Sequence, residues 1–250
     1  MRLENKTALI TGSNRGIGFC VLSRFAAEGC DIYAHSRSPC SDFSKKTSEI
    51  AIRNNVKIYH VYFDLRESAE IRAGITAIIK TNNPIDILVN SAGIIHGGLF
   101  HMTTIQSVKD VFSVNFFGML EVTQLVSKYM IRKKAGSIIN IASVAGIDLS
   151  AGNCAYGTSK AAVIAFSKTL CFELSSYGIR VNVVAPSLTD TDMAKANEAN
   201  KERDMMLNNK EPFKRMAQPN EVSDAICFLA SEESSFINGE VIRVDGGNKF

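Results

Sequence analysis

The sequence predicts an α/β protein of one domain, residues 1–250, in which a seven-stranded parallel sheet is flanked by helices in a doubly wound arrangement. Short β-branched runs alternate with longer helical patterns along the whole chain, which is typical of successive strand–helix–strand units. Several runs, such as residues 85–89 and 138–141, are apolar almost throughout, as expected of strands buried on both faces. No linker rich in Pro, Gly or Ser divides the 250 residues.

In chain order, we expect strands at residues 7–10, 32–35, 56–63, 85–90, 136–142, 179–185 and 240–244. Helices are expected between them, near residues 16–28, 41–54, 67–81, 104–132, 154–177 and 219–231. Residues 187–218 interrupt this alternation, because they are polar and rich in Met. They follow the carboxyl end of a strand, where open α/β sheets bind ligands. We therefore interpret 187–218 as a substrate flap, with a surface insertion of no role as the alternative.

The composition excludes several classes of protein. A hydrophobic fraction of 46% and a charged fraction of 21% exclude disorder, collagen and coiled coil. The net charge of +3 is spread along the chain, which argues against nucleic acid or an anionic membrane as a partner. No stretch approaches the roughly 18 apolar residues of a spanning helix, and no secretion signal precedes the first strand. The six cysteines form no C-x-x-C pair, so we expect no metal site and reduced thiols in the cytoplasm.

A glycine-rich turn follows the first strand and opens the first helix. Its sequence is Gly12-Ser13-Asn14-Arg15-Gly16-Ile17-Gly18. Glycines let the backbone turn tightly and approach a pyrophosphate, whose charge then lies at the amino end of the helix. An ordinary tight turn is the alternative, but a place between a first strand and a helix is the context that dinucleotide binding requires.

The end of the second strand indicates which dinucleotide is bound. NAD binders normally have an acidic residue there, about 20 residues after the glycines. This strand ends instead in Ser36-Arg37, and Arg15 lies inside the glycine turn. Two guanidinium groups can bind a 2′-phosphate through charge-assisted hydrogen bonds. The sequence therefore predicts NADP(H), with two solvated surface arginines as the alternative.

A tyrosine and a lysine lie one helical turn apart at Tyr156 and Lys160, on the same face of a predicted helix. The spacing alone proves little, because Tyr129 and Lys133 repeat it at what looks like a solvated helix end. The first pair differs in its surroundings, since Ser143 ends a buried strand 13 residues before Tyr156.

These residues fall into five motifs whose order resembles that of the short-chain dehydrogenase/reductase family. The motifs are Thr11–Gly18, Asn90-Ser91-Ala92-Gly93, the set Asn115, Ser143, Tyr156 and Lys160, then Pro186–Thr191 and Val244–Gly247. Ser91 and Ser187 depart from the family pattern, in which an Asn and a Gly are usual. The likeness covers essentially the whole chain and implies a Rossmann fold and an oxidoreductase of alcohols or carbonyls.

The resemblance implies a catalytic role for four residues. Tyr156 would exchange a proton with the substrate oxygen, and its phenol pKa, ordinarily about 10, would have to fall towards neutrality. Lys160, together with the positive ring of the oxidised cofactor, would stabilise the phenolate and hold the nicotinamide ribose. Ser143 would hydrogen-bond the substrate oxygen, and Asn115 would hold a water that relays protons to Lys160.

The resemblance also implies the contacts of NADPH or NADP+. Asp64 would contact the adenine, Ala92 and Gly93 would leave room beside the adenosine half, and Thr191 would bond the carboxamide. The full set expected to bind the cofactor is Gly12, Asn14, Arg15, Gly16, Ile17, Gly18, Ser36, Arg37, Asp64, Leu65, Asn90, Ala92, Gly93, Tyr156, Lys160, Pro186 and Thr191.

The substrate is the least determined feature. The pattern of residues 143–146, 178–182 and 238–240 is similar to that of 3-oxoacyl-[acyl-carrier-protein] reductases. This implies reduction of a 3-oxoacyl thioester in fatty acid biosynthesis, with an acyl carrier protein that Arg132, Lys133 and Lys134 could help to dock. Tyr177 and the loop 96–102 fit this pattern less well. A reductase or dehydrogenase of a sugar, polyol or other small secondary alcohol is the alternative, and a non-catalytic cofactor-binding protein is a remoter one.

The two long helices are expected to mediate self-association. Residues 104–132 and 154–177 have more apolar surface than one face of a sheet can cover, including Phe112, Phe116, Phe117, Phe166 and Phe172. The family resemblance implies that these helices pair across a two-fold axis and give a homodimer or a homotetramer.

Overall fold

The computed structural model describes residues 1–81, 83, 85–195 and 212–247. One sheet of seven parallel strands has the order β3-β2-β1-β4-β5-β6-β7. The strands are β1 (Thr7–Thr11), β2 (Asp31–Ser36), β3 (Ile58–Tyr62), β4 (Ile87–Asn90), β5 (Gly136–Ile141), β6 (Ile179–Pro186) and β7 (Val241–Val244). The helices are α1 (Gly16–Ala27), α2 (Ser41–Asn54), α3 (Ser68–Lys80), α4 (Ile105–Phe112), α5 (Met119–Lys133), α6 (Cys154–Ser175), α7 (Asp192–Lys195) and α9 (Pro219–Ala230). The predicted doubly wound α/β fold is confirmed.

The strand order reverses beside β1, which pairs with β2 on one edge and with β4 on the other. Such a reversal leaves a crevice at the carboxyl ends of the strands, where ligands bind in open α/β sheets. The Thr11 hydroxyl fixes the loop beyond β4, because it accepts hydrogen bonds from the backbone N–H groups of Ser91 (3.1 Å) and Ala92 (3.2 Å). The ends of β1 and β4 are thus held together at the crevice.

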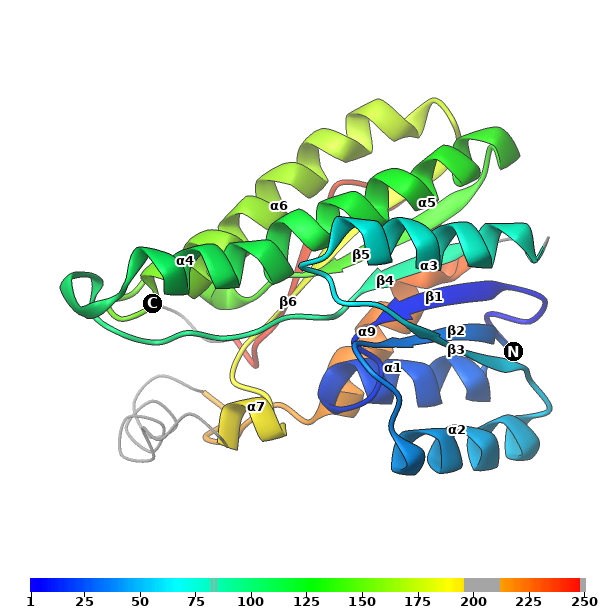
Figure 1. Ribbon diagram of the computed structural model, residues 1–250, viewed down its shortest axis with the longest axis horizontal. Coiled ribbons are helices and arrows are strands. Elements are labelled where there is room, and N and C mark those ends of the chain that lie inside the picture. The colour runs from blue at the N-terminus through cyan, green and yellow to red at the C-terminus, as the bar shows by residue number, and fades with distance from the viewer. Residues whose placement is uncertain (82, 84, 196–211, 248–250) are drawn as a thin grey trace.

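Helices cover both faces of the sheet (Figure 1). On one face α1 and α9 pack against the strands and against each other, with Phe25 and Ile226 fully buried. On the other face α3, α5 and α6 form the covering layer, with Ile75 and Val126 fully buried. Strands β1, β4 and β5 are buried almost throughout and contribute side chains to both layers, as the sequence predicted for 85–89 and 138–141.

The predicted helix at 104–132 is one helical run of three parts. Between α4 and α5, residues Ser113–Gly118 form a π-helical segment, a feature that often occurs at functional sites. Gly118 lies where this run crosses the loop after β3, and a Cβ at Gly118 would be 2.2 Å from the Leu65 carbonyl oxygen. The helix can therefore approach the loop only with glycine at position 118. Asn115 belongs to the same π-helical segment and is buried.

The other elements differ from expectation at their ends. The predicted strand at 56–63 is shorter, Ile58–Tyr62, and the one at 85–90 is Ile87–Asn90. The predicted flap 187–218 is described only in part: it contains the short helix α7 and leads into α9 at Pro219. Its residues 196–211 lie outside the described part of the chain, so the flap stays a prediction.

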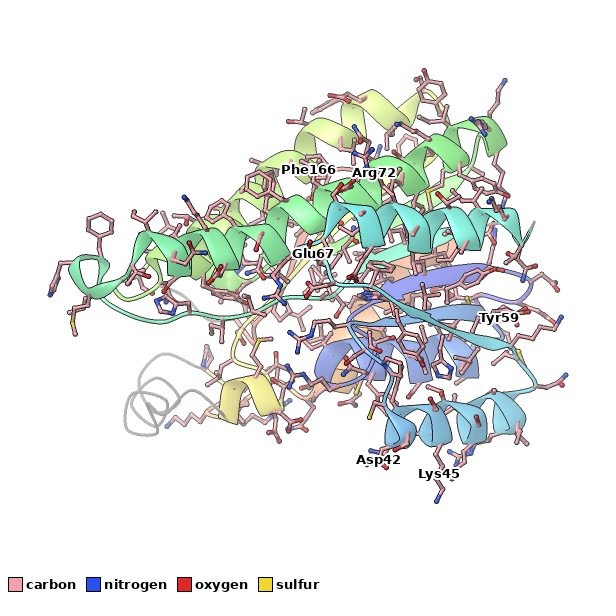
Figure 2. The ribbon with its side chains drawn as sticks, in the orientation of Figure 1. Asp42, Lys45, Tyr59, Glu67, Arg72 and Phe166 are labelled. Atoms are coloured by element: carbon pink, nitrogen blue, oxygen red, sulfur yellow. The ribbon has the colours of Figure 1, made fainter. Side chains whose placement is uncertain are left out.

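The edge strand β3 and helix α2 form the periphery of the sheet. Tyr59 of β3 lies at this margin (Figure 2), and its ring stacks on that of Tyr33 with centroids 5.2 Å apart. Asp42 and Lys45 project from α2 away from the sheet (Figure 2).

Within the described residues, no helix is long and apolar enough to cross a membrane. The same residues contain no group of three potential metal ligands, and all six cysteines are unpaired.

Candidate active site

A cavity of about 1170 Å³ opens at the carboxyl ends of the strands, which exceeds the usual 300–1,000 Å³ of a small-ligand pocket. The cavity runs from the ends of β2 and β3, across the glycine turn after β1, to the ends of β5 and β6. Of the predicted site residues, those that line it are Gly12, Asn14, Arg15, Gly16, Ile17, Gly18, Ser36, Arg37, Asp64, Leu65, Ala92, Gly93, Ser143, Tyr156, Lys160, Pro186 and Thr191. Two predicted residues, Asn90 and Asn115, are not among the lining residues.

The glycine turn leaves space for a phosphate group. Gly12 and Gly16 have φ of +66° and +55°, the left-handed region that favours glycine. A Cβ at Gly18 would lie 2.2 Å from the Gly12 carbonyl oxygen, so only glycine lets the first turn of α1 pack this closely against the backbone of Gly12. The amino end of α1 begins at Gly16 and faces the same cavity. Backbone N–H groups at a helix start form an anion site, and the turn therefore fits a pyrophosphate.

Three arginines line the end of the cavity formed by β2 and β3. Arg15 and Arg37 were expected there, and Arg66 was not. Arg66 binds Asp64 through a close ion pair, Nη2 to Oδ2 at 2.5 Å. The hydrogen bond from Arg66 is the main cause of a lowered pKa at Asp64, and the charge of Arg37 adds to it. Asp64 is therefore an ionised carboxylate that is paired with the Arg66 guanidinium. A contact between Asp64 and an adenine would compete with this ion pair.

Tyr156 and Lys160 lie in the first turns of α6, and both face the cavity. The Lys160 ammonium is 5.9 Å from the centre of the Tyr156 ring and donates a hydrogen bond of 2.8 Å to the Ile141 carbonyl. Burial lowers the pKa of Lys160 to about 8, because a charged ammonium is poorly solvated there. The pair that the sequence predicted is thus brought together at one end of the cavity.

The pKa of Tyr156 shows an effect that the sequence did not predict. Burial raises it above its ordinary value, and the hydrogen bond to Ser143 offsets only part of that increase. The ammonium of Lys160 is directed to the Ile141 carbonyl rather than to the phenol oxygen. The expected lowering is therefore not a property of the chain alone.

Ser143 begins the loop after β5 and caps the short 3₁₀ turn Val144–Gly146. Its hydroxyl accepts a hydrogen bond from the Ala145 N–H at 3.2 Å and lies within hydrogen-bonding reach of Tyr156. The serine therefore has a fixed position beside the phenol, as a residue that orients a carbonyl oxygen would need.

Asn115 is close to the catalytic pair, and its side chain makes three hydrogen bonds within the protein. Its Oδ1 accepts from the Ile94 N–H at 2.8 Å, and its Nδ2 donates to the Ile94 carbonyl at 2.9 Å and to Ser159 Oγ at 3.0 Å. Asn115 thereby fixes the loop that contains Ile94 and Gly93. The predicted relay water at Asn115 stays a prediction.

The side chain of Asn90, which the sequence predicts to bind the cofactor, does not line the cavity, and a cofactor contact at this residue stays a prediction. Its Nδ2 donates to Thr123 Oγ1 at 2.9 Å and to Asn140 Oδ1 at 2.8 Å, both buried. Alternate side chains of a strand point to opposite faces of the sheet, and Asn90 points towards α5 rather than into the crevice. Through these two bonds Asn90 connects β4 to β5 and to α5.

Replacement of Asn90 with alanine should lower the free energy of unfolding by about 2–3 kcal/mol, because two buried hydrogen bonds are lost. The dissociation constant of NADPH should change by less than about 2-fold, since no contact with the cavity is removed. Urea denaturation and a fluorescence titration with NADPH measure the two quantities. Weaker NADPH binding together with an unchanged free energy of unfolding would support a direct contact between Asn90 and the cofactor.

The basic residues considered for carrier docking are not near the catalytic pair. Helix α5 runs opposite to the strands, so Arg132, Lys133 and Lys134 lie just before β5 begins at Gly136. Lys133 forms an ion pair with Asp86, which precedes β4 at the same edge. Tyr156 lies at the other edge, where the strands end. Arg132, Lys133 and Lys134 therefore do not lie beside the active site of the same chain, because a crossover helix returns the chain to the amino ends of the strands, and carrier docking through them stays a prediction.

Further residues line the cavity that the sequence analysis did not name individually, although Leu99 lies in the loop 96–102 and Leu188 and Met193 lie in the predicted flap 187–218. They are His35, Ser38 and Cys40 at and after the end of β2, together with Ile94, Ile95, Leu99, Asp148, Asn153, Leu188 and Met193 from the loops after β4, β5 and β6. Asp148 forms an ion pair with Arg243 at 2.6 Å, which connects the loop after β5 to the last strand. Outside these two segments no sequence pattern distinguished the lining residues, because their places depend on how separate loops meet.

Comparison with known proteins agrees with this geometry. A short-chain dehydrogenase model, described as enoyl-(acyl carrier protein) reductase, matches residues 12–249. The chain belongs to the short-chain dehydrogenase/reductase family. The chain is 37% identical to the 3-oxoacyl-[acyl-carrier-protein] reductase FabG of Thermotoga maritima, and the match covers 99% of each of the two proteins. It is 35% identical to the 2,3-dihydro-2,3-dihydroxybenzoate dehydrogenase of Bacillus subtilis, over 98% of this chain and 96% of that one.

A solved structure extends the comparison. A gluconate 5-dehydrogenase from Burkholderia cenocepacia, in complex with NADP and tartrate, superposes with a TM-score of 0.91 at 32% identity, over 98% of this chain and 96% of that one. The predictions of a Rossmann-type fold and of a nicotinamide-dependent oxidoreductase are thereby confirmed for this short-chain dehydrogenase/reductase. The predicted cofactor, NADP(H), agrees with the NADP in that neighbour and with the arginines at the adenosine end. The relatives act on different substrates, so the substrate itself is a matter for proposal.

Proposed function

We propose that the chain is an NADPH-dependent reductase of 3-oxoacyl thioesters. The observation that carries this proposal is the apolar lining beside the catalytic pair. Ile94, Ile95, Leu99, Leu188 and Met193 line the same cavity as Tyr156 and Lys160, and an acyl chain is a ligand that such a surface favours. Relatives named as 3-oxoacyl-[acyl-carrier-protein] reductases, matched over almost the full chain, support the same substrate class.

The residues of the chain supply binding, orientation and one proton. Gly12, Gly16 and Gly18 would hold the pyrophosphate, and Arg15 and Arg37 the 2′-phosphate. The bound nicotinamide supplies the hydride that reduces the carbonyl carbon. Ser143 would hydrogen-bond the carbonyl oxygen and hold it near the phenol.

Tyr156 would then give its proton to that oxygen as the alcohol forms. A raised phenol pKa suits this direction, because Tyr156 is fully protonated at neutral pH and ready to act as an acid. The buried Lys160 ammonium, near the same ring, would stabilise the phenolate that remains. In the reverse direction the same groups would take the proton from an alcohol.

A reductase or dehydrogenase of a sugar, polyol or other small alcohol is the second candidate. Asp148, Ser150, Asn153 and Thr189 also line the cavity and could bind hydroxyl groups. The gluconate 5-dehydrogenase and the dihydroxybenzoate dehydrogenase act on such polar molecules by their names. A non-catalytic cofactor-binding protein is the third, and the intact set Ser143, Tyr156 and Lys160 argues against it.

A substrate panel tests the proposal. With NADPH, kcat/KM for an acetoacetyl thioester should exceed that for ketoses and cyclic diketones by at least about 10-fold, as expected for an apolar pocket. The thioester is offered both as an N-acetylcysteamine ester and on an acyl carrier protein, so that a contribution of the carrier is measured separately. Faster reduction of a ketose would transfer the proposal to the second candidate. NADPH binding without reduction of any ketone would support the third.

We also propose that the chain forms a two-fold oligomer in the cytoplasm. Phe117 of the π-helical segment before α5 and Phe172 of α6 are 60% and 80% exposed, which is unusual for phenylalanine. Phe116 and Phe166 join these helices edge to face, with ring centroids 6.1 Å apart, so both exposed rings belong to one helical layer. Size-exclusion chromatography with light scattering gives the mass directly, and a monomer would contradict the proposal.

A further inference from the structure

His35, at the end of β2, is hydrogen-bonded on both ring nitrogens. Its Nδ1 lies 3.2 Å from the backbone N of Gly12, and its Nε2 lies 2.9 Å from the carbonyl oxygen of Phe63. A carbonyl can only accept, so Nε2 must carry the proton, and Nδ1 is then free to accept from the Gly12 N–H. These two partners fix one neutral tautomer of the imidazole.

The backbone of His35 adds two more connections to the same turn. Its carbonyl oxygen accepts from the Ser13 N–H at 2.9 Å and from the Ser13 hydroxyl at 3.0 Å. The ring is 3% exposed and lies against the ring of Phe63, with centroids 3.9 Å apart. A single residue thus joins the first two positions of the glycine turn to the ends of β2 and β3.

This connection matters because the turn has little else to hold it. Gly12 has no side chain and a positive φ, and glycine loses more conformational freedom on folding than other residues. The orientation of the peptide at Gly12 affects where the next residues of the turn lie, and of these Asn14, Arg15 and Gly16 line the cavity. A fixed acceptor at Nδ1 therefore holds the turn in one conformation before a ligand binds.

We propose that His35 is a positioning residue of the dinucleotide site, which sets the conformation of the Gly12–Ser13 turn for the pyrophosphate by accepting the Gly12 N–H at its Nδ1. The inference rests on the proposed role of this turn in binding NADPH. It assigns a function to the last buried position of β2 before Ser36-Arg37, next to the residues that would choose between NADPH and NADH.

The charge state of the ring follows from its surroundings. Burial lowers the pKa of His35 to about 4, while the Phe63 carbonyl and the charge of Asp64 oppose that shift. The other charged groups lining this end of the cavity are Arg15, Arg37 and Arg66, and their positive charges favour the neutral ring. A protonated Nδ1 would place one donor against another at Gly12, so the contact exists only with the neutral form.

The direction of the pH effect on folding follows. The folded-state pKa of about 4 lies below the ordinary value of 6.5, so between these values the unfolded chain binds more protons than the folded one. Stability therefore rises with pH across this window and is lost as the pH falls through it. Above about pH 6.5 the ring is neutral in both states and its contact with Gly12 is complete.

Two matched variants separate the ring nitrogens. In His35→Asn the amide oxygen takes the place of Nδ1 and can accept from Gly12, whereas His35→Gln places its amide NH₂ near Nε2, next to the Phe63 carbonyl. We expect His35→Asn to keep the dissociation constant of NADPH within about 3-fold of the wild type. His35→Gln leaves the Gly12 N–H without its acceptor and should weaken NADPH about 10-fold, the usual effect of one lost hydrogen bond.

The second part of the experiment measures the binding of NADH, which has the same pyrophosphate as NADPH but lacks the 2′-phosphate. His35→Gln should weaken NADH and NADPH by the same factor, measured by isothermal titration at pH 7.5. Thermal unfolding of both variants reports any general loss of stability, which would weaken Asn and Gln alike. Equal affinity of the three proteins, or equal loss in both variants, overturns the inference.

The experiment distinguishes failure of this inference from failure of the proposed function. If the wild type binds no dinucleotide, the proposed function fails first. If neither variant folds, nitrogen NMR of the wild-type ring decides, since the inference requires a protonated Nε2 and an unprotonated Nδ1 from pH 7.5 to pH 5.5. The opposite tautomer, or a charged ring in that range, would overturn the role of Nδ1.

Discussion

Replacement of Tyr156 with phenylalanine should reduce turnover by at least about 1,000-fold, while the dissociation constant of NADPH changes by less than about 2-fold. General acid catalysis contributes about 10²–10⁴ in rate, and the variant removes the only atom that gives the proton. The ring that lies near the Lys160 ammonium is retained, so the shape of the site is preserved. Stopped-flow or steady-state oxidation of NADPH measures the rate, and fluorescence titration measures the affinity.

The chain contains its own control for this variant. Tyr129 has the same spacing to Lys133 as Tyr156 has to Lys160, but it lies in α5 near the edge where the strands begin. Tyr129→Phe should leave both turnover and NADPH affinity unchanged. If Tyr156→Phe kept more than about one tenth of the wild-type rate, Tyr156 would not be the proton donor and the mechanism would fail.

The rate of reduction should also depend on pH in one direction. Tyr156 has a raised pKa and stays protonated as an acid, whereas the buried Lys160 has a pKa of about 8. Above that value the ammonium loses its charge and no longer stabilises the phenolate. We expect kcat for reduction to be constant from about pH 6 to about pH 7.5 and to fall above pH 8. A rate that increased through this range would mean that Lys160 acts in its neutral form.

The second large effect is expected at Arg37, where replacement with aspartate should weaken NADPH about 50-fold. A charge-assisted hydrogen bond contributes roughly 1.5–3 kcal/mol, and the new carboxylate repels the 2′-phosphate in addition. Arg37 is exposed, so solvent reduces the Coulomb part of this change. NADH has no 2′-phosphate, and the aspartate can accept from its ribose hydroxyls, so NADH should bind as well as before or more tightly.

The informative quantity is the ratio of the two dissociation constants, measured by titration at one ionic strength. Arg53→Asp, on the last turn of α2, has the same change of charge and serves as the control. An unchanged ratio in Arg37→Asp would mean that the phosphate is bound elsewhere, with Arg15 and Arg66 as the next residues to replace. His35→Gln differs from this variant because it should leave the ratio constant while both constants increase.

Much of the fold and part of the site were predictable because they depend on local sequence. Alternating β-branched and helical segments require crossovers, and crossovers make a parallel sheet. The glycine turn is decided by positive φ at Gly12 and Gly16, which glycine alone adopts without strain. Tyr156 and Lys160 share a helix face by spacing. The sequence also contains enough information to place Arg132–Lys134 at the amino ends of the strands, because these residues immediately precede the predicted strand 136–142.

The rest was decided by contacts between segments far apart in the sequence. Asn90 bonds to Thr123 and Asn140, 33 and 50 residues away, and only the packed layer shows that its side chain faces a helix and not the cavity. Asn115 is committed to Ile94 and Ser159, which no spacing indicates. The pKa values of Tyr156 and Lys160 move with burial, a property of the assembled core.

His35 shows the division most clearly. The sequence by itself determined a strand that ends in Ser36-Arg37 and a glycine turn that can approach a phosphate. It did not determine that the histidine before them accepts from Gly12 and donates to Phe63. That arrangement depends on β1, β2 and β3 lying side by side in register, because hydrogen bonds have strict distances and directions that only the folded sheet provides.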